Sequence, residues 1–405
     1  MKKIKYLIIF SLFFLLSPVF EIQAESLSGR ILLDVERNGE AWYIYPEDNK
    51  RYYLGRPSDA FKVMRELGLG ITEYDFQQIA QAGMPIYGNL ELTEKLAGRI
   101  VLQVERNGEA WYINPVDLKK YYLGRPDDAF KIMRELGLGI SRKDLAVIHK
   151  NTFSESLNDY SSYQYKKKIT VNGVDFFIDL ITIDLNNPNL KIITDTANSE
   201  DCLSKCEAKP LIDYVILNNA FSAINASYFD TSALKLNYYF FPVYNSRLQT
   251  FINSSQLKYP TTGPLMAFDT NNKFYYFKDS RDFKSVSNFE NVYGVKLQAT
   301  IGNKPRLIEN KQNLLIDWEV DEGQLKTKTL RNAIAYKSDN NGKGIIYLVV
   351  ARQATVIDLA EILKTMEVDY AINLDGGYSS ALYYNDEYMV GPGRNIPNAI
   401  LFSEG

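Results

Sequence analysis

The clearest candidate for chemistry is an acidic stretch near the C-terminus that is rich in glycine and hydroxyl groups. It begins at Asp375 and reads Asp-Gly-Gly-Tyr-Ser-Ser through Ser380, directly after the apolar segment 370–374, which is typical of a buried strand. A strand would fix the position of Asp375, and the glycines would let a ligand approach the backbone. The spacing alone fits a tight turn equally well. The glycine patterns of P-loops and of dinucleotide-binding folds are both missing from the sequence.

The rarity of histidine and cysteine restricts the chemistry further. The 405 residues include one histidine, His149, so a site built on several imidazoles is excluded. His149 lies at an expected domain boundary and is interpreted as an incidental polar residue. Two cysteines cannot make a four-thiolate metal site. Catalysis must therefore depend on carboxylates, Arg, Lys, amides, hydroxyls or a hard metal ion. Asp375 and Asp230 could hold Ca²⁺ or Mg²⁺, although no EF-hand pattern is present.

Four segments, in order, resemble motifs of the phosphodiester glycosidase family. Residues 373–380 are similar to the family's N-L-D-G-G-G-S-S signature, and residues 224–229 to its I-N-G-G-F/Y-F motif. Residues 331–335 are similar to R-T-A-I-G, and residues 393–400 to R-x-V-x-N-A-L. The resemblance covers about the last 240 residues of the chain. The chain departs from these motifs at Ala226, Ser227, Asn332 and Tyr378.

The resemblance implies cleavage of a sugar-1-phosphodiester at the anomeric carbon. Phosphate is a good leaving group, so the main need is a carboxylate that stabilises positive charge on the sugar, or that acts as nucleophile or base. Asp375 is the first candidate for this role and Asp230 the second. Arg331 and Arg394 would bind the phosphate through paired N–H donors. The expected catalytic set is Asp375, Asp230, Asn225 and Arg331, and the expected substrate-binding set is Arg394, Gly376, Gly377, Tyr378, Ser379, Ser380 and Asn332.

The N-terminus has the layout of a secretory signal peptide at 1–24. Three lysines precede an apolar run that is short for a membrane span, and Ala24 offers a cleavage position. Cleavage there would take the net charge from −3 to −5, by loss of three Lys and one Glu. An uncleaved anchor is the alternative. No other apolar run is long enough to span a bilayer, so we expect an exported protein in which Cys202 and Cys206 form a local structural disulfide.

Two repeats follow the signal peptide, at 28–80 and 97–149. Residues 29–71 align without gaps on residues 98–140, with 35 of 43 positions identical. Each unit is predicted to be a β-meander with strands near 30–36, 41–44 and 51–54, capped by a helix that begins at Pro57 or Pro126. Ala60, Phe61, Met64 and Leu67 would share the inner face of the first helix. Trp42 and Trp111 are either sugar platforms or core residues, and the core interpretation is favoured.

The expected fold class is α+β. The two meander-plus-helix repeats, joined by a linker at 81–95, are followed by a linker at 150–168 and by a mixed α/β catalytic domain at 169–405. The predicted function is an exported hydrolase that acts on an envelope or extracellular glycan, with a phosphorylated carbohydrate as partner. Interspersed charges argue against nucleic acid, and no integral membrane domain is expected after signal cleavage. A non-catalytic exported protein that binds phosphorylated glycan or cell wall, and an envelope scaffold dominated by the repeats, are the alternatives.

Overall fold

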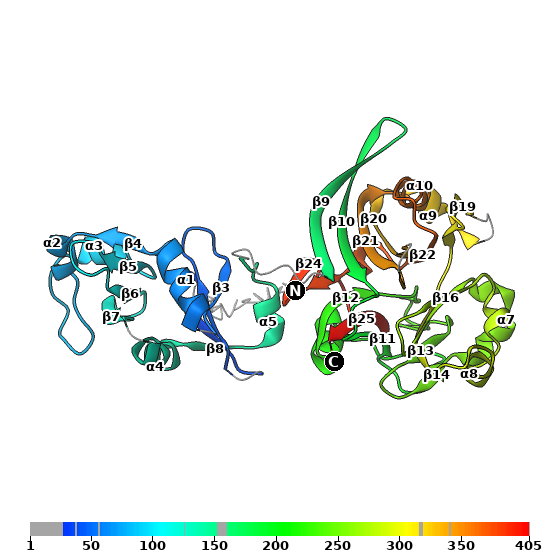
Figure 1. Ribbon diagram of the computed structural model, residues 1–405, viewed down its shortest axis with the longest axis horizontal. Coiled ribbons are helices and arrows are strands. Elements are labelled where there is room, and N and C mark those ends of the chain that lie inside the picture. Colours follow the sequence, from blue (N-terminus) through cyan, green and yellow to red (C-terminus); the bar gives the residue numbers. More distant parts are fainter. Residues whose placement is uncertain are drawn as a thin grey trace, which may run out of the picture.

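The chain folds into two lobes that follow one another in sequence (Figure 1). The computed structural model describes residues 27–36, 39–55, 57–124, 126–151, 160–315, 319–339 and 342–404. The predicted signal peptide at 1–24 lies outside these residues. Among the helices of the described residues, none is both long enough and apolar enough to cross a bilayer. Helices and strands both contribute, in several sheets, which confirms the α+β class.

The N-terminal lobe contains two four-stranded sheets that exchange one strand each. The first sheet has the order β3 (Arg51–Tyr53), β2 (Ala41–Ile44), β1 (Ile31–Asp34) and β8 (Leu138–Ile140). The second has the order β4 (Leu69–Ile71), β5 (Ile100–Gln103), β6 (Ala110–Asn114) and β7 (Lys119–Tyr122). Helices α1 (Pro57–Leu67) and α4 (Pro126–Leu136) carry the chain across, so β4 pairs in parallel with β5, and β8 with β1. Three smaller helices complete the lobe: α2 (Glu73–Gln77), α3 (Leu90–Lys95) and α5 (Arg142–Ala146).

A close and reciprocal contact joins the two repeats. The Tyr43 hydroxyl donates to the carbonyl of Gly98, and the Tyr112 hydroxyl donates to the carbonyl of Gly29, both at 2.6 Å. A Cβ atom on Gly29 would lie 2.5 Å from the Cα of Gly98, so only glycine allows the backbones to approach this closely. One apolar core is shared by both repeats. The units are therefore interleaved rather than folded side by side, because neither has enough apolar surface to form a core alone.

Two side chains of the first repeat and one of the second test the predicted packing. Trp42 is 2% exposed and lies under the guanidinium of Arg51, so it is a core residue and not a sugar platform. Trp111 packs against Phe76 and Tyr122 and donates to the side chain of Gln103, which gives it the same role. Phe61 is 53% exposed, so the prediction that it faces the core was wrong.

The C-terminal lobe is built on three antiparallel sheets. The largest has seven strands, and Ser161–Val171 forms its edge strand. The predicted linker at 150–168 therefore differs from the structure, since its last eight residues belong to this sheet. The predicted linker at 81–95, in the N-terminal lobe, also differs from the structure, because it contains helix α3. The seven strands, in order, are β19 (Gln312–Asn313), β18 (Arg306–Glu309), β22 (Tyr370–Leu374), β20 (Thr329–Lys337), β21 (Ile345–Ala354), β10 (Val174–Asp184) and β9 (Ser161–Val171).

The other two sheets have five strands each and share a core with the first. Side chains from all three sheets meet in this core, including Ile224, Met266 and Ile372. One sheet has the order β11 (Leu190–Thr196), β25 (Asn398–Glu404), β12 (Ala220–Asn225), β23 (Leu382–Tyr384) and β24 (Glu387–Val390). The other has the order β14 (Thr250–Ile252), β13 (Val243–Asn245), β17 (Leu297–Gly302), β15 (Leu265–Asp269) and β16 (Phe274–Phe277).

Helices cover the outer face of each sheet. Successive side chains of β20 point to opposite faces of the sheet. Ile334 lies in the common core, whereas Ala333 and Ala335 pack on the side of helix α10 (Val356–Thr365). Both faces of the strand are therefore apolar. Thr355 caps α10 through a capping box with Asp358. The remaining helices are α6 (Leu211–Asn218), α7 (Ser280–Phe283), α8 (Val286–Tyr293), α9 (Glu322–Lys326), and the 3₁₀ turns η1 (Ser254–Lys258), η2 (Pro260–Thr262) and η4 (Gly377–Ser379).

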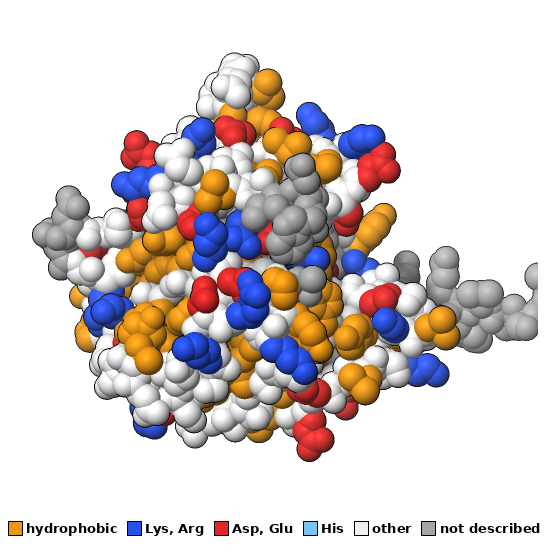
Figure 2. All heavy atoms as spheres, turned by 90° about the vertical axis from the view of Figure 1, so that its right-hand side faces the viewer, with side chains coloured by type: hydrophobic (Ala, Val, Ile, Leu, Met, Phe, Trp, Pro, Cys, Tyr) orange, Lys and Arg blue, Asp and Glu red, His pale blue; other side chains and the backbone are white. Residues whose placement is uncertain are grey.

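The two lobes meet at the turn between β23 and β24. The Arg51 guanidinium donates to the backbone carbonyl of Asp386, and Arg142 pairs with the Asp386 carboxylate at 3.4 Å. His149 bonds through Nδ1 to Glu387 at 2.5 Å, so this histidine has a place in the contact between the lobes. At the far side of the molecule from the repeats, Lys and Arg side chains are scattered among Asp and Glu and among apolar patches (Figure 2).

Candidate active site

Strand β22 delivers Asp375 to a tight turn at the edge of the common core. The Asp375 N–H donates to the carbonyl of Ala226 at 2.8 Å, which joins the turn to the end of β12. Gly376 lies against β20, where a Cβ atom would come within 2.6 Å of the carbonyl of Leu330. Gly377 has a φ of 58°, a conformation that glycine adopts without strain. The two glycines therefore shape the turn that presents Asp375.

Buried amides hold the backbone of Asp375 from behind. The side chains of Asn225 and Asn332 both donate to the Asp375 carbonyl, at 2.7 and 2.8 Å, and Asn332 also donates to Asn225. Ser380 donates to the Asn332 side chain at 3.1 Å. All three are 2% exposed or less. They were expected to contact the substrate, but their burial and their partners give them a positioning role instead. Asn332, which replaces a family threonine, supplies two of these bonds.

The Asp375 carboxyl is a buried acid with two arginines nearby. It is 7% exposed, and burial raises its pKa to about 6. Hydrogen bonds from the Ser379 hydroxyl and from the Gly376 N–H, with the charges of Arg394 and Arg331, oppose this rise. The N–H of Gly376 thus serves Asp375 rather than a ligand. A carboxyl in this state gains or loses its proton close to neutral pH.

Arg394 is the exposed cation of the site. Its Nε donates to the Ser379 hydroxyl at 2.7 Å, and its guanidinium lies 5.1 Å from the centre of the Phe229 ring. Ser379 therefore connects Arg394 with Asp375. Within the described part of the chain, the two terminal nitrogens of Arg394 form no hydrogen bond. These two nitrogens would bind a pair of phosphate oxygens.

Arg331 is held more firmly by the protein. Its Nη2 donates to the carbonyls of Gly323 and Thr327 at 2.9 and 2.8 Å, and it is 6% exposed. These bonds attach helix α9 to strand β20. Arg331 thus contributes its charge to Asp375 while most of its donors serve the fold, which differs from the expected phosphate clamp.

A cavity of about 470 Å³ adjoins this group. Tyr228 and Phe229 line it. Burial, and to a smaller extent the charge of Asp375, raises the pKa of the Tyr228 phenol, and the Phe229 ring lies beside the Arg394 guanidinium. Burial raises the pKa of Tyr228 to about 12, so it stays a neutral phenol. The full lining is Tyr228, Phe229, Asp230, Lys235, Tyr238, Tyr239, Phe240, Phe241, Lys304, Glu319, Val320, Asp321 and Gln324.

Aromatic rings and two lysines give the cavity its chemical character. Among the described residues, neither Lys235 nor Lys304 forms an ion pair, whereas Glu319 is paired bidentately with Arg306. Asp321 caps helix α9. Aromatic faces with a few polar groups suit a sugar ring, and an unpaired lysine suits an anionic oxygen.

Two predicted residues lie apart from Asp375 itself. Asp230 lines the cavity, and a hydrogen bond from Ser232 lowers its pKa, so its carboxylate stays ionised. Tyr378 is 89% exposed and therefore does not narrow the cavity. In the described part of the chain, no three His, Cys, Asp or Glu side chains lie together as metal ligands. Two arginines beside Asp375 also make that carboxylate a poor cation site.

Several residues that matter at the site were not found from the sequence. Asn373 donates to the Tyr228 hydroxyl at 2.6 Å, and its carbonyl accepts from Asn303. Lys304 and Gln324 line the cavity although neither lies in a recognised motif. Tyr228 and Asn373 do lie within motifs, so their positions carried a signal; Lys304 and Gln324 offered none, because spatial proximity alone brings them here.

The C-terminal lobe is thus an antiparallel α+β domain in which a buried acid lies near two arginines and an aromatic cavity. Residues 218–403 match the family model of phosphodiester glycosidases. The matched region runs from the end of α6 through β25 and includes Asn225, Arg331, Asp375 and Arg394.

Solved structures with a similar arrangement come from distant proteins. A hypothetical protein from Synechocystis is 15% identical with a TM-score of 0.47, over 62% of this chain and 63% of that one. The chain thus spans less than two thirds of that protein's length. The zebrafish N-acetylglucosamine-1-phosphodiester alpha-N-acetylglucosaminidase catalytic domain, auto-inhibited by its pro-peptide, is 13% identical with a TM-score of 0.46, over 62% of this chain and 86% of that one. No curated protein matches the chain.

Proposed function

We propose that the protein is an exported hydrolase that cleaves a sugar-1-phosphodiester between the anomeric carbon and the phosphate oxygen. The observation that carries the proposal is the buried Asp375 carboxyl, with a pKa of about 6, beside the exposed Arg394 and next to an aromatic cavity. A phosphodiester carries one negative charge, and Arg394 is placed to bind it. The family of the domain supports the same reaction class.

In this reaction the bond between C1 of the sugar and the phosphate oxygen breaks, and its electrons leave with the phosphate. Positive charge develops on the sugar ring and is stabilised by the ionised Asp375. Water then supplies the hydroxyl group at C1, and the products are a free sugar and a phosphomonoester. Asp375 acts either as nucleophile at C1 or as base towards water, and both roles need its ionised form.

The aromatic cavity is proposed to bind the sugar, with Lys235 and Lys304 at its wall and Asp230 contacting hydroxyl groups. The Cys202–Cys206 pairing fits an oxidising compartment outside the cytoplasm, which supports export. An envelope or extracellular glycan that contains phosphodiester links is therefore the proposed substrate.

The test is release of free sugar from a panel of sugar-1-phosphodiesters, with the corresponding neutral glycosides as comparison. Asp375→Asn should lower turnover by at least about 100-fold, the lower range for loss of an acid–base group, and should leave binding intact. Asp282→Asn, at an exposed position of helix α7, is the matched control and should behave as wild type. Equal turnover of Asp375→Asn and wild type would refute the assignment.

The same assay separates the non-catalytic alternative. A binding protein would retain a phosphorylated glycan on a column without releasing sugar from any diester. That outcome would contradict the hydrolase, whereas release that depends on Asp375 would exclude a purely binding role.

A further inference from the structure

A polar segment at 197–209 is attached at both ends to the stretch that carries Arg394. The Ala197 N–H donates to the carbonyl of Pro397 at 2.8 Å. Lys209 and Ile396 exchange two backbone hydrogen bonds, at 3.0 and 2.9 Å. Ile396 lies two residues beyond Arg394, so the segment is based on one wall of the site.

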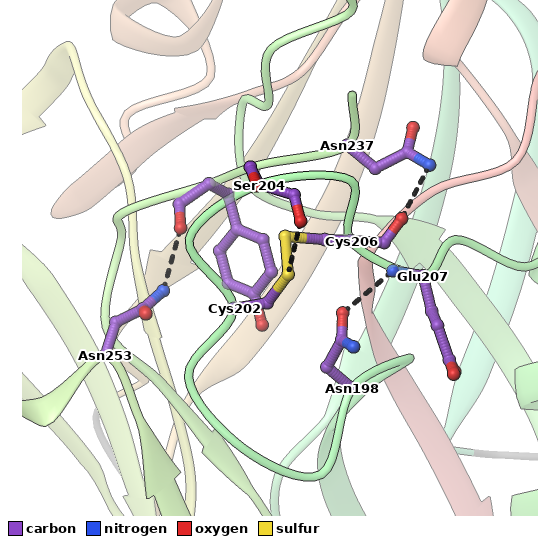
Figure 3. Close-up of a disulfide and its surroundings, with 8 residues drawn as sticks. Asn198, Cys202, Ser204, Cys206, Glu207, Asn237 and Asn253 are labelled. Carbon is purple, nitrogen blue, oxygen red and sulfur yellow. Dashed lines mark hydrogen bonds between the residues drawn. A yellow bond between two sulfur atoms is a disulfide. The ribbon is translucent and has the colours of Figure 1, made fainter. Parts of the chain in front are cut away.

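The disulfide closes the middle of this segment. A disulfide joins Cys202 and Cys206, whose Cα atoms are 5.7 Å apart (Figure 3). Leu203, between them, is 79% exposed. The segment has almost no apolar side chains to bury. The disulfide and hydrogen bonds, rather than core packing, therefore determine its path.

Cys206 is bonded twice to a loop that forms another wall of the site. Its N–H donates to the carbonyl of Leu236 at 2.8 Å. The Asn237 side chain donates to the Cys206 carbonyl at 3.0 Å (Figure 3). The loop is closed on itself, since Asn237 donates to the Asp230 carbonyl at 2.7 Å and Asp230 donates to the Tyr238 carbonyl at 2.8 Å. It is thus a unit that Cys206 holds at one end.

This loop, residues 230–238, supplies Asp230, Lys235 and Tyr238 to the cavity. Leu236 is 45% exposed, so its side chain does little to hold the loop in place through packing. None of the bonds that join it to Cys206 involves Asp375. Loop 230–238 can therefore shift without changing the position of the Asp375 carboxyl.

We propose that the Cys202–Cys206 disulfide is a positioning element for substrate binding: it fixes loop 230–238 relative to the Arg394 stretch and so sets the shape of the cavity. The proposal rests on the function proposed above for the site and adds a determinant of its affinity. Breaking the disulfide lets the loop move away from the substrate, while Asp375 and its amide supports keep their arrangement. Substrate binding is weakened and the chemical step is not.

Steady-state kinetics of the full chain test whether the disulfide affects substrate binding and not the chemical step. The double variant Cys202→Ser/Cys206→Ser should raise KM for a cleaved diester by about tenfold and leave kcat within about twofold, with an unchanged pH profile. Asn237→Gly removes the side-chain bond to Cys206 and keeps the positive φ of 60° accessible, so it should raise KM in the same direction. The two effects should not be additive, because they act on one contact.

Leu203→Ser, within the same five-residue loop, is the matched control and should leave KM unchanged. A KM equal to wild type in the double variant would overturn the proposal. So would an equal loss in kcat and in kcat/KM, which would place the disulfide in general folding or in the chemical step.

Hydrogen exchange gives a readout that does not depend on activity. In the full chain, loss of the disulfide should speed exchange of the Asp230 and Asn237 amides by about tenfold relative to the amides of β22. If wild type cleaves no diester, the proposed function fails but this comparison still decides on the loop. Unchanged exchange at both amides would overturn the positioning role.

Discussion

Replacing Asp375 with Asn should stabilise the folded protein at neutral pH while it removes activity. Burial raises the pKa of Asp375 from 3.8 to about 6, and one unit corresponds to 1.36 kcal/mol, so the ionised group weakens folding by about 3 kcal/mol. The sign follows from proton binding. The folded protein keeps this proton up to about pH 6, whereas the unfolded chain releases it near 3.8. The free energy of unfolding of wild type therefore falls as pH rises from about 3.8 to about 6. The uncharged Asn of the variant binds no proton, so the variant does not lose stability in this way.

The assay is urea unfolding of wild type and Asp375→Asn at a series of pH values from about 4 to 8. Other titrating groups cancel in the difference between the two proteins. From pH 4 to pH 8, the free energy of unfolding of Asp375→Asn should therefore rise relative to that of wild type by about 2.5 kcal/mol. Asp230→Asn is the control, because a hydrogen bond from Ser232 lowers the pKa of Asp230 below 3.8, so its difference from wild type should stay nearly constant across this range. A difference for Asp375→Asn that does not change with pH would refute the account of this carboxyl.

Three further predictions follow from individual contacts. Arg394→Lys keeps the charge but loses the paired donors, so KM for a phosphodiester should rise about tenfold in steady-state kinetics, and an unchanged KM would exclude the phosphate contact. Asn332→Thr restores the family residue but removes donors to Asp375, so urea unfolding should show a loss of about 1 kcal/mol, and no loss would contradict the positioning role. Asp386→Ala removes the carboxylate that pairs with Arg142, so limited proteolysis should cut between the lobes faster than in wild type, and an equal rate would show that the turn does not hold them.

Most strands and helices could be predicted because their signals are local. The strand before Asp375, the three strands of the first repeat and the helix starts at Pro57 and Pro126 all lie in or near their predicted ranges. The exchange of β4 and β8 could not be predicted, since each is a Leu-Gly-Ile segment that fits either sheet. The direction of the preceding helix and the contact of Gly29 with Gly98 decide the partner, and both depend on the folded chain.

The candidate site shows the same division. The motifs predicted that Asn225, Arg331, Asp375 and Arg394 would come together, and the structure brings them around one turn. Their roles depended on burial, which a motif does not encode: Asn225 faces the Asp375 backbone, whereas Arg394 faces outwards. The cavity could not be predicted at all, because its walls come from loops far apart in the sequence.

The most direct test of the central claim is the position of the bond that breaks. Hydrolysis of a sugar-1-phosphodiester in water enriched in oxygen-18, followed by mass spectrometry of both products, assigns the incoming oxygen. The account predicts that the label enters the sugar at C1 and that the phosphomonoester stays unlabelled, with no label incorporated by Asp375→Asn. Label in the phosphomonoester would mean attack at phosphorus and would contradict a glycosidase that works through Asp375.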